Sequence, residues 1–565
     1  MSSSPNFFDA IFQCEQFPFK AFSFQTRNVT ESLYSEVDKW VGYPVLINAP
    51  TGAGKSTFVF NTLADFARSK NRYILVLSNR LALNMQQKVQ LSKKFGIPDM
   101  GTRMLEDYHI FGNIVLSTYQ NILPIMHGQT IIPNEANGPM FIVFDEAHFF
   151  CSDATFNPWT ETILRTLMQR YPSSTRIYMS ATPEDVKPAI AAIEYENFKQ
   201  PIYNDPAYLR LLNSFNGAAI TEYIFPRDYQ HISLRFFSHW DTILGSILNA
   251  SDSNKWLIFV NQKETGRDLK KQLSSTLADF IHAASSSDTI RTLTRRQCFD
   301  QKVLISTSVI DNGISIHDSL LKNIVLDFVD YIELVQMLGR KRTYYGENIN
   351  LYVKIPSIDE VKEYRKCAES LYETMLSFEM NPSHFFQNRW GSLIDNEQKL
   401  FAPMPYQNSV TFGINTFAKY QLALQCGKYE KLEDELSKDA NAYARQVCSW
   451  LQKPFSEDLY LDHSLDQQAK SKMTEILNSY LDTSISADIG LVNLEESLKS
   501  CLNPMQIKNC KLKNDGSSRG AANIKKIIKA FDLPYSLSGK HKNSYQLTKT
   551  PEITPKGHQI MYFSV

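Results

Sequence analysis

The sequence predicts an α/β protein with two tandem doubly wound parallel sheets, followed by a mainly helical C-terminal region. Three observations predict this fold class. Short runs that are apolar almost throughout recur between helix-like segments in residues 45–182, which is typical of parallel strands covered on both faces. A second series of such runs lies in residues 255–353. After residue 356 the apolar residues recur at helical spacing instead.

Length and charge indicate how many domains the chain has and how it could bind nucleic acid. The 565 residues exceed what one hydrophobic core usually supports, and we expect four domains, at 1–200, 201–356, 357–498 and 499–565. Lys and Arg number 59, as do Asp and Glu, so nucleic-acid binding would have to come from a local patch. No apolar run has membrane length, and residues 1–18 lack the pattern of a signal peptide. We therefore expect a cytoplasmic protein without a membrane partner.

Several kinds of chemistry are not indicated. The eight cysteines are scattered without a Cys-x-x-Cys pair, so we expect reduced thiols and neither a zinc ribbon nor a disulfide framework. The sequence contains no metal-spaced His cluster and no recognisable Ser/His/Asp set that would suggest a nuclease. Any cutting of a strand would need a partner protein.

A phosphate-binding loop follows the first apolar run. The stretch NAPTGAGKSTFVF, residues 48–60, places Gly52, Gly54, Lys55 and Ser56 between a predicted strand and a predicted helix. The glycines let successive backbone N–H groups point at a polyphosphate, and the helix N-terminus adds positive charge. We expect Lys55 to reach the β and γ phosphates of ATP, and Ser56 to bind Mg²⁺. The other expected nucleotide contacts in the loop are Thr51, Ala53 and Thr57.

Two adjacent carboxylates follow the later apolar run FIVF. Asp145 and Glu146 end this run, where the ligand-facing residues of an open α/β sheet lie. We expect Asp145 to hold Mg²⁺ and Glu146 to deprotonate the water that attacks the γ phosphate. The two carboxylates can have different roles because the cation neutralises one of them.

Six further segments accompany the loop and the sequence Asp-Glu-Ala-His. They are residues 78–80, 117–121, 180–182, 258–262, 305–316 and 336–342. In this order they resemble motifs Ia, Ib, III, IV, V and VI of the superfamily 2 helicases, specifically those with a DEAH or DExH box. The resemblance covers roughly residues 22–353. It implies two RecA-like lobes, with ATP held by the first lobe and completed by arginines of the second, and movement along a strand.

The resemblance implies residues for hydrolysis. Arg340 and Arg342 would be arginine fingers, and Gln336 would contact the γ phosphate or the attacking water. The residues implied to couple hydrolysis to the second lobe are His148, Ser180 and Thr182. The common form of motif VI has its second arginine at the eighth place, but Thr343 stands there and Arg342 comes one residue earlier. Arg342 would then reach the phosphate differently, or Arg340 would act alone.

The resemblance also implies contacts with the rest of the nucleotide. Gln25 stands where many family members place a glutamine that contacts adenine, and a surface glutamine is the alternative. Gly313 and Ser315 stand where motif V meets the ribose. Many relatives have an aspartate in place of Ser315, and a serine binds a hydroxyl more weakly than a carboxylate does.

The resemblance also implies which residues contact the nucleic-acid strand. These residues have hydroxyl, amide or cationic groups and stand at the ends of predicted β-strands. They are Ser78, Arg80, Thr118, Asn261 and Thr307. Such groups bind phosphate and sugar oxygens with little sequence preference. DEAH boxes occur on motors of DNA and of RNA, and the likeness of motif V to bacterial DNA translocases favours DNA. A helicase, a duplex translocase without strand separation, and a nucleotide-gated sensor that recruits a nuclease or another replication or defence protein all stay open.

Two further regions follow the segments that resemble the helicase motifs. Residues 357–498 are rich in helix formers and predict a helical accessory domain. Residues 499–549 contain eleven Lys and Arg but only two Asp. Within them AANIKKIIKAF and PYSLSGKHKNSYQLT fit a helix and a β-hairpin of winged-helix type that binds a phosphate backbone, with a solubilising surface as the alternative.

Overall fold

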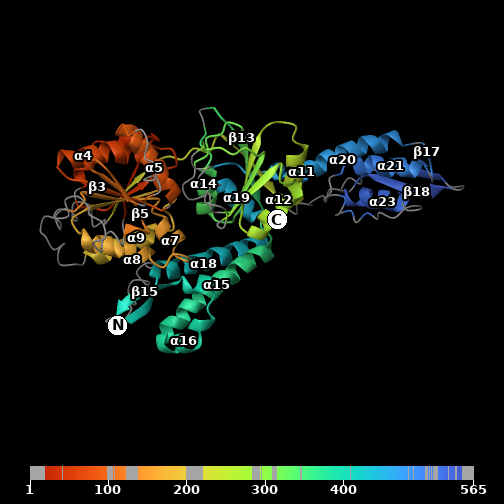
Figure 1. Cartoon of the computed structure of the whole chain (residues 1–565). Coiled ribbons are helices and arrows are strands. Elements are labelled where there is room, and N and C mark those ends of the chain that lie inside the picture. Colours follow the sequence, from red (N-terminus) through yellow and green to blue (C-terminus); the bar gives the residue numbers. More distant parts are fainter. Residues whose placement is uncertain are drawn as a thin grey trace, which may run out of the picture. The chain divides into compact units, whose positions relative to one another are not determined.

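The structure is a computed structural model of the 565-residue chain (Figure 1). It describes residues 19–40, 42–79, 81–97, 106, 108–122, 138–198, 220–282, 285, 293, 296–307, 315–343, 346–406, 409–481, 483–487, 489–502, 507, 510, 512, 520–531, 533–540 and 544–549. No helix among these residues is both long enough and apolar enough to cross a bilayer.

The first sheet has eight strands in the order β1-β8-β2-β7-β6-β3-β5-β4. These strands are β1 (Phe19–Ser23), β2 (Val45–Asn48), β3 (Ile74–Ser78), β4 (Tyr108–Phe111), β5 (Ile114–Thr118), β6 (Phe141–Asp145), β7 (Thr175–Ser180) and β8 (Ile220–Ile224). All neighbouring pairs are parallel except β4 with β5. The carboxyl ends of the parallel strands therefore meet at one edge of the sheet.

Helices cover both faces of this sheet. Figure 1 shows α4 (Ala64–Ser69) and α5 (Leu81–Lys94) on one face, and α8 (Thr160–Arg170) and α9 (Lys187–Phe198) on the other. Side chains of β2 alternate between the two cores: Val45 and Ile47 belong to one cluster, and Leu46 to the other. The prediction of a doubly wound sheet is confirmed, and we call this part of the chain the first lobe.

A buried ion pair joins α9 to the sheet. Arg176 of β7 is fully buried and donates to both carboxylate oxygens of Glu194, at 2.6 and 2.8 Å. The Tyr178 hydroxyl donates to the same carboxylate at 2.7 Å. Removing one partner of such a pair leaves the other charge buried without compensation.

We expect Arg176→Met to destabilise the first lobe by about 3–5 kcal/mol, since Glu194 stays buried and unpaired. Urea unfolding of the full chain measures this as a lower midpoint for the lobe. The double variant Arg176→Met/Glu194→Leu should regain most of the loss. Arg68→Met removes an exposed pair with Asp65 and serves as the control. An unchanged midpoint for Arg176→Met contradicts the assigned role.

The second sheet has six strands in the order β11-β12-β10-β13-β14-β9. These strands are β9 (Ile232–Phe237), β10 (Lys255–Val260), β11 (Ala278–Ile281), β12 (Val303–Ser306), β13 (Leu321–Asp327) and β14 (Ile349–Lys354). The pairs β10–β12, β10–β13 and β11–β12 are parallel. The helices of this region are α11 (Trp240–Asn249), α12 (Lys263–Leu273) and α14 (Tyr331–Leu338). The prediction of a second sheet is confirmed.

Some strands are not predicted by the apolar runs. Strand β1 is half-buried or exposed along its length, and in β9 buried and exposed residues alternate at the start. Both therefore lack the continuous apolar run that identifies a strand buried on both faces. Strand β4 is mostly half-buried and is not predicted either. Strand β8 is buried but is also missed, because Thr221 and Glu222 interrupt its apolar run.

The chain divides into two compact units. Unit 1 comprises residues 1–233, 254–350 and 356–453, and unit 2 comprises residues 234–253, 351–355 and 454–565. We call residues 254–350 of unit 1 the second lobe. The four domain bounds expected from the sequence stay a prediction.

Unit 1 also contains helices that follow the second lobe. They are α15 (Ile358–Met380), α16 (Pro382–Asn388), α17 (Asp395–Gln398), α18 (Thr416–Lys438) and α19 (Ala442–Trp450), with a hairpin of β15 (Phe401–Tyr406) and β16 (Ser409–Ile414). Helices α15 and α18 lie side by side (Figure 1). Helix α15 begins at a capping box in which Ser357 and Glu360 bond each other's backbone N–H. The helical region is as expected, but the hairpin is not predicted.

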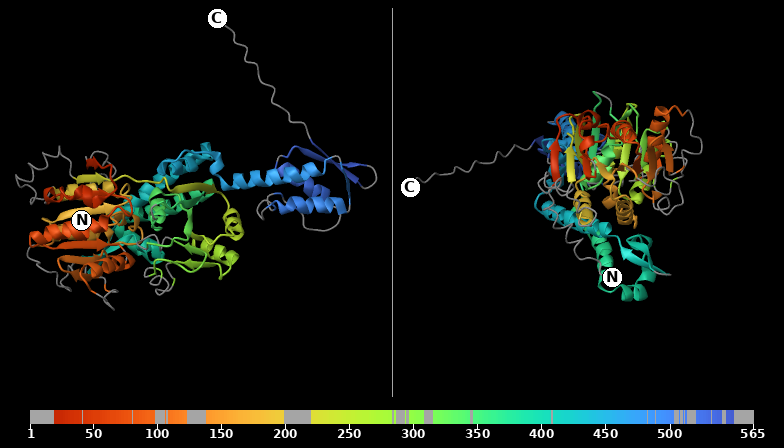
Figure 2. Two further views of the ribbon diagram at one scale, coloured as in Figure 1. Left: turned by 90° about the horizontal axis from the view of Figure 1, so that it is seen from above. Right: turned by 90° about the vertical axis from the view of Figure 1, so that its left-hand side faces the viewer.

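Unit 2 has its own core. Its C-terminal part contains α20 (Leu461–Ser479), β17 (Ser484–Ser486), α21 (Ile489–Ser500), α23 (Gly520–Ala530), β18 (Tyr535–Lys540) and β19 (Ser544–Lys549). The three strands have the order β17-β19-β18, and the left view of Figure 2 shows them beside the helices. The described elements follow in the order helix, strand, two helices and hairpin, and the winged-helix type expected from the sequence stays a prediction. The helix and the hairpin proposed from the sequence are present as α23 and β18-β19.

Candidate active site

The phosphate-binding loop lies between β2 and α3 (Lys55–Phe58), which continues through a π-helical turn (Val59–Leu63) into α4. Gly52 and Gly54 have φ angles of +80° and +86°, which a residue with a Cβ rarely adopts. Lys55 is buried, and its Nζ donates to the carbonyls of Ala49 and Pro50 at 2.7 and 3.3 Å. Burial lowers the pKa of Lys55, while nearby carboxylates oppose the shift. In the same loop Ala53 is buried, Thr51 and Ser56 are half-buried, and Thr57 is exposed.

Helix α2 (Val29–Leu33) lies beside the phosphate-binding loop and is hydrogen-bonded to it. Asn28 caps the helix through its Oδ1, and the N–H of Val29 donates to the Ala53 carbonyl at 3.0 Å. Arg27 donates to the Thr51 carbonyl at 3.1 Å. A cavity of about 430 Å³ is lined by Arg27, Asn28, Thr30, Glu31, Gly52, Ala53, Gly54 and Thr57. Gln25 is exposed and is not among these lining residues.

Sequence reasoning therefore missed Arg27 and Asn28. The available signal was local: an asparagine followed by Val-Thr-Glu is a typical helix start. That signal predicts the helix but not its contact with the loop, which depends on tertiary packing.

Asp145 and Glu146 lie at the end of β6, at the same edge of the sheet. The Asp145 carboxylate accepts from Gln87 Nε2 at 2.8 Å and from the backbone N–H of Glu146 at 3.1 Å. Burial and the charge of Glu146 raise the pKa of Asp145 to about 7. Burial alone would raise the pKa of Glu146 too, but positive groups led by His148 and Lys55 hold it below its usual value. Of the two carboxyls, Glu146 is therefore the stronger acid and is ionised at neutral pH.

The backbone at Glu146 is unusual. Its φ of +54° is uncommon for a residue with a Cβ, and such strain often marks functional sites. Its Oε2 is buried and lies 3.4 Å from His148 Nδ1, and it has no hydrogen-bond partner among the described residues. A buried carboxylate oxygen that lacks a donor is suited to accept a proton from a bound water.

The carboxylate of Asp145 and the hydroxyl of Ser56 are of the kinds that bind Mg²⁺. Among the described residues, no group of three or more His, Cys, Asp or Glu side chains could hold a metal ion by itself. Mg²⁺ usually binds through one or two carboxylates and the phosphates of the substrate. The Asp145 carboxylate and the Ser56 hydroxyl fit this pattern, and a cation there would favour the ionised form of Asp145.

A hydrogen-bond network joins the two lobes beside Glu146. Ser180 ends β7 and Thr182 follows it, and the Thr182 N–H donates to Ser180 Oγ at 3.0 Å. Gln336 of α14, in the second lobe, donates from Nε2 to Thr182 Oγ1 at 3.0 Å. His148 Nδ1 lies 3.3 Å from Ser180 Oγ and 3.5 Å from Gln336 Nε2. The structure therefore brings together all the residues that the resemblance implies for coupling.

Two arginines follow α14 and lie near the phosphate-binding loop. Arg340 is buried and donates to the side-chain and backbone oxygens of Gln336 at 2.8 and 3.0 Å. Arg342 donates to Ser315 Oγ at 3.0 Å, and its Nη1 lies 3.8 Å from the position a Cβ would take on Gly52. Burial and the charge of Arg340 lower the pKa of Arg342 to about 10. A buried and a half-buried cation beside the phosphate-binding loop favour an anion between them.

The approach of α14 to the loop is close. A Cβ on Gly339 would lie 2.9 Å from Thr51 Oγ1, so a larger residue there would push the lobes apart. A second cavity, of about 230 Å³, is lined by residues of both lobes that include Arg27, Gly52 and Arg342. The position of Arg342, one residue early in motif VI, still places it beside the loop.

The residues implied for strand contact lie at the ends of strands, as expected. Ser78, Thr118 and Thr307 are buried, whereas Asn261 is exposed. Thr118 Oγ1 accepts from the Asn121 N–H at 3.3 Å, so it also stabilises a turn. Arg80 and Gly313 lie outside the described residues.

One family model matches the chain. Residues 25–185 match the family described as "Type III restriction enzyme, res subunit". The matched segment contains the phosphate loop and both carboxylates, and it agrees with the resemblance to superfamily 2 helicases. The match covers less than a third of the chain, and the two sheets agree with the expected fold of two tandem RecA-like α/β domains. No curated protein matches the chain.

Solved helicase structures share only a loose likeness. S. cerevisiae Dbp5 bound to RNA and ADP BeF3 is 13% identical, with a TM-score of 0.42 over 64% of this chain and 91% of that one. Helicase MrfA bound to DNA and AMPPNP is 15% identical, with a TM-score of 0.41 over 69% and 53%. Mycobacterium smegmatis helicase Lhr bound to ssDNA and AMP-PNP is 13% identical, with a TM-score of 0.38 over 65% and 49%. The chain thus spans about half of MrfA and of Lhr, and these likenesses assign no function.

Proposed function

We propose that this chain is an ATP-dependent nucleic-acid helicase or translocase of the DEAH or DExH type that acts on DNA. The observation that carries the proposal is the meeting of Lys55, Glu146, Gln336 and Arg342 at one edge of the first sheet. Phosphoryl transfer depends mainly on positioning and on stabilising charge, and these groups supply both. The preference for DNA rests on the likeness of motif V, residues 305–316, to bacterial DNA translocases.

Each residue has a role in hydrolysis. Lys55 and the backbone N–H groups of the loop bind the phosphates, and Mg²⁺ held by Ser56 and Asp145 would neutralise charge on them. Glu146 accepts the proton of the attacking water. Arg340 and Arg342 stabilise the charge that develops on the transferred group.

The network around Gln336 links hydrolysis to movement. Gln336 contacts Thr182 of the first lobe and Arg340 of the second, so loss of the γ phosphate would weaken the contacts between the lobes. Repeated opening and closing of the lobes then moves the strand-contacting residues along a backbone.

Helix α23 of unit 2 is proposed as an auxiliary nucleic-acid contact. Ile524 and Ile527 are buried in the core of the unit, while Lys525 and Lys529 are exposed on the opposite face. A helix with a basic outer face in a winged-helix topology is suited to a phosphate backbone.

We expect Lys525→Gln/Lys529→Gln to weaken DNA binding most at low salt. The slope of log affinity against log salt should fall by about 0.7 to 0.9 for each phosphate that the helix no longer neutralises. Fluorescence anisotropy over a salt series measures this slope. Lys438→Gln on α18, where the lysine is exposed and pairs with Asp434, is the control. Equal slopes for the double variant and the unaltered chain would rule out this surface.

Strand displacement on forked and blunt DNA duplexes separates the candidate functions. A helicase separates forked duplexes in the presence of ATP, which is the result we expect. A duplex translocase displaces a bound protein from DNA without separating strands. A nucleotide-gated sensor does neither, although it binds DNA ends and hydrolyses ATP slowly.

A further inference from the structure

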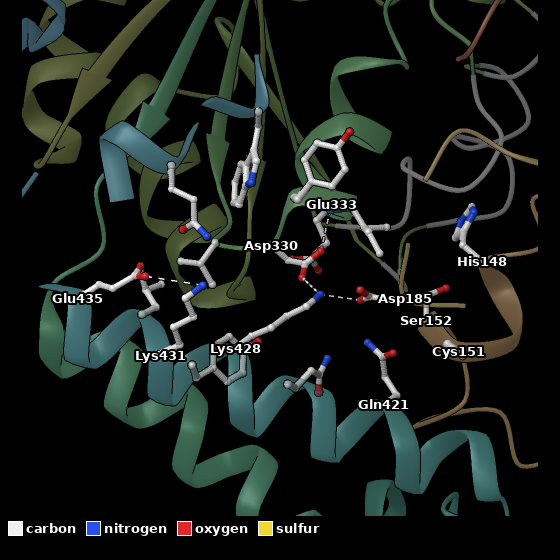
Figure 3. A pocket seen from close by; sticks show the side chains of 18 residues that line it. His148, Cys151, Ser152, Asp185, Asp330, Glu333, Gln421, Lys428, Lys431 and Glu435 are labelled. Carbon is white, nitrogen blue, oxygen red and sulfur yellow. Dashed lines mark hydrogen bonds and ion pairs between the residues drawn. The ribbon is translucent and has the colours of Figure 1, made fainter. Parts of the chain in front are cut away.

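Lys428 of α18 forms ion pairs with both lobes. Its Nζ donates to Asp185 Oδ2 at 2.6 Å and to Asp330 Oδ2 at 2.7 Å. Figure 3 shows the lysine pointing between the two carboxylates, which come from different segments of the chain. Asp185 lies three residues after Thr182 in the first lobe, and Asp330 caps α14 in the second lobe. One side chain of the helical region therefore connects the two lobes.

The two carboxylates depend on this lysine. The three side chains line a cavity of about 340 Å³, and the Asp185 and Asp330 carboxylates are only 12% and 20% exposed. Burial raises the pKa of Asp185 to about 6, although Lys428 opposes the shift. Burial alone would lower the pKa of Lys428, but the charges of Asp330 and Asp185 raise it. Without the lysine, two poorly hydrated carboxylates would face each other.

Helix α18 and the following helix α19 are bound to different lobes on either side of Lys428. At its start Asn415 donates to Thr160 Oγ1 at 2.9 Å, in α8 of the first lobe. After its end Tyr443 of α19 donates to the Phe328 carbonyl at 2.6 Å, in the second lobe. Helices α18 and α19 together thus connect one lobe to the other, with Lys428 between the two attachments.

The pair with Asp330 acts on the helix that carries the catalytic residues. Asp330 Oδ1 accepts from the Ile332 N–H at 2.7 Å and so begins α14. The same short helix contains Gln336 and ends beside Gly339, which touches the phosphate loop. A shift at the start of α14 would therefore move Gln336 away from Thr182.

We propose that Lys428 is a positioning residue that holds the two lobes in the closed arrangement by bridging Asp185 and Asp330, so that the helical region controls closure of the ATP site. Only the kinetic consequences of this proposal, those for ATP hydrolysis, rest on the proposed ATPase function. A protein whose binding-competent state is less populated binds its ligand with a proportionally weaker apparent affinity.

The test compares Lys428→Met with Lys431→Met. Lys431 lies one turn further along α18 and pairs with Glu435 of the same helix, so it is a matched control. Without nucleotide, hydrogen exchange of residues 183–187 and 330–338 should rise in Lys428→Met only. The KM for ATP should rise at least about fivefold, the lower end of typical coupling between sites, with little change in kcat.

Removing the carboxylates should restore closure. The triple variant Lys428→Met/Asp185→Asn/Asp330→Asn lacks the repulsion, and an asparagine still caps α14. We expect its exchange and KM to return toward those of the unaltered chain, and Lys428→Arg to keep both near normal. If Lys428→Met leaves exchange and KM unchanged, or the triple variant is no better than Lys428→Met, the bridge does not control closure. An unaltered chain without ATP turnover refutes the proposed function, while the exchange measurement still decides the role of Lys428.

Discussion

Glu146→Gln should lower ATP turnover by about 10²–10⁴-fold, the usual contribution of a general base, while ATP stays bound. The substitution keeps the size of the side chain but replaces the charged carboxylate by a neutral amide, which cannot accept the proton. The proposed contacts of Lys55, Ser56 and Asp145 with the phosphates and Mg²⁺ would remain. Steady-state turnover and binding of a fluorescent ATP analogue together measure the two effects.

Lys55→Ala should also abolish turnover, but through a different step. It removes a positive charge from the loop, so ATP affinity should fall together with the rate. Glu264→Gln, an exposed carboxylate on α12, is the control and should behave like the unaltered chain. Near-normal turnover in Glu146→Gln, or unchanged ATP affinity in Lys55→Ala, contradicts the assigned roles.

Arg340→Ala and Arg342→Ala should each lower turnover by about 10³-fold or more, the loss typical of an arginine finger. From the sequence alone, the effect of losing Arg342 stays open, because Arg342 stands one residue before the place of the second arginine in the common form of motif VI. Its Nη1 lies beside Gly52, so we expect a loss as large as for Arg340. Single-turnover hydrolysis measures both.

The two arginines should differ in a second measurement. Arg340 holds Gln336 through two hydrogen bonds, so its loss should also raise hydrogen exchange in α14. Arg342 makes no such contact with Gln336 among its described hydrogen bonds, and its loss should leave α14 protected. Arg267→Ala, an exposed arginine of α12, is the control. If either catalytic variant keeps more than about a tenth of normal turnover, that residue is not an arginine finger.

Sequence patterns predict best what depends on local composition. The strands with continuous apolar runs were predicted by those runs, and the phosphate-binding loop by its glycines and lysine. The half-exposed β1 and the alternating β9 have no such run. The hairpin β15-β16 was also missed, because it interrupts a region with helical composition.

The contacts that orient the site could not be predicted in the same way. Gln87 reaches Asp145 across 58 residues of sequence, and Lys428 reaches Asp185 across 243. Neither residue stands in a recognisable motif, because its role depends on which elements pack together. Arg27 and Asn28 illustrate the same point at short range: their contacts with the loop follow from the position of α2.

ATP hydrolysis measured in parallel with single-stranded DNA, duplex DNA and RNA of matched length tests the central claim most directly. A motor whose two lobes close around ATP and a strand should hydrolyse ATP slowly alone and much faster with a nucleic acid. We expect the largest stimulation with DNA, and its loss in Glu146→Gln. The same rate with and without all three polymers, or no turnover at all, would contradict the account.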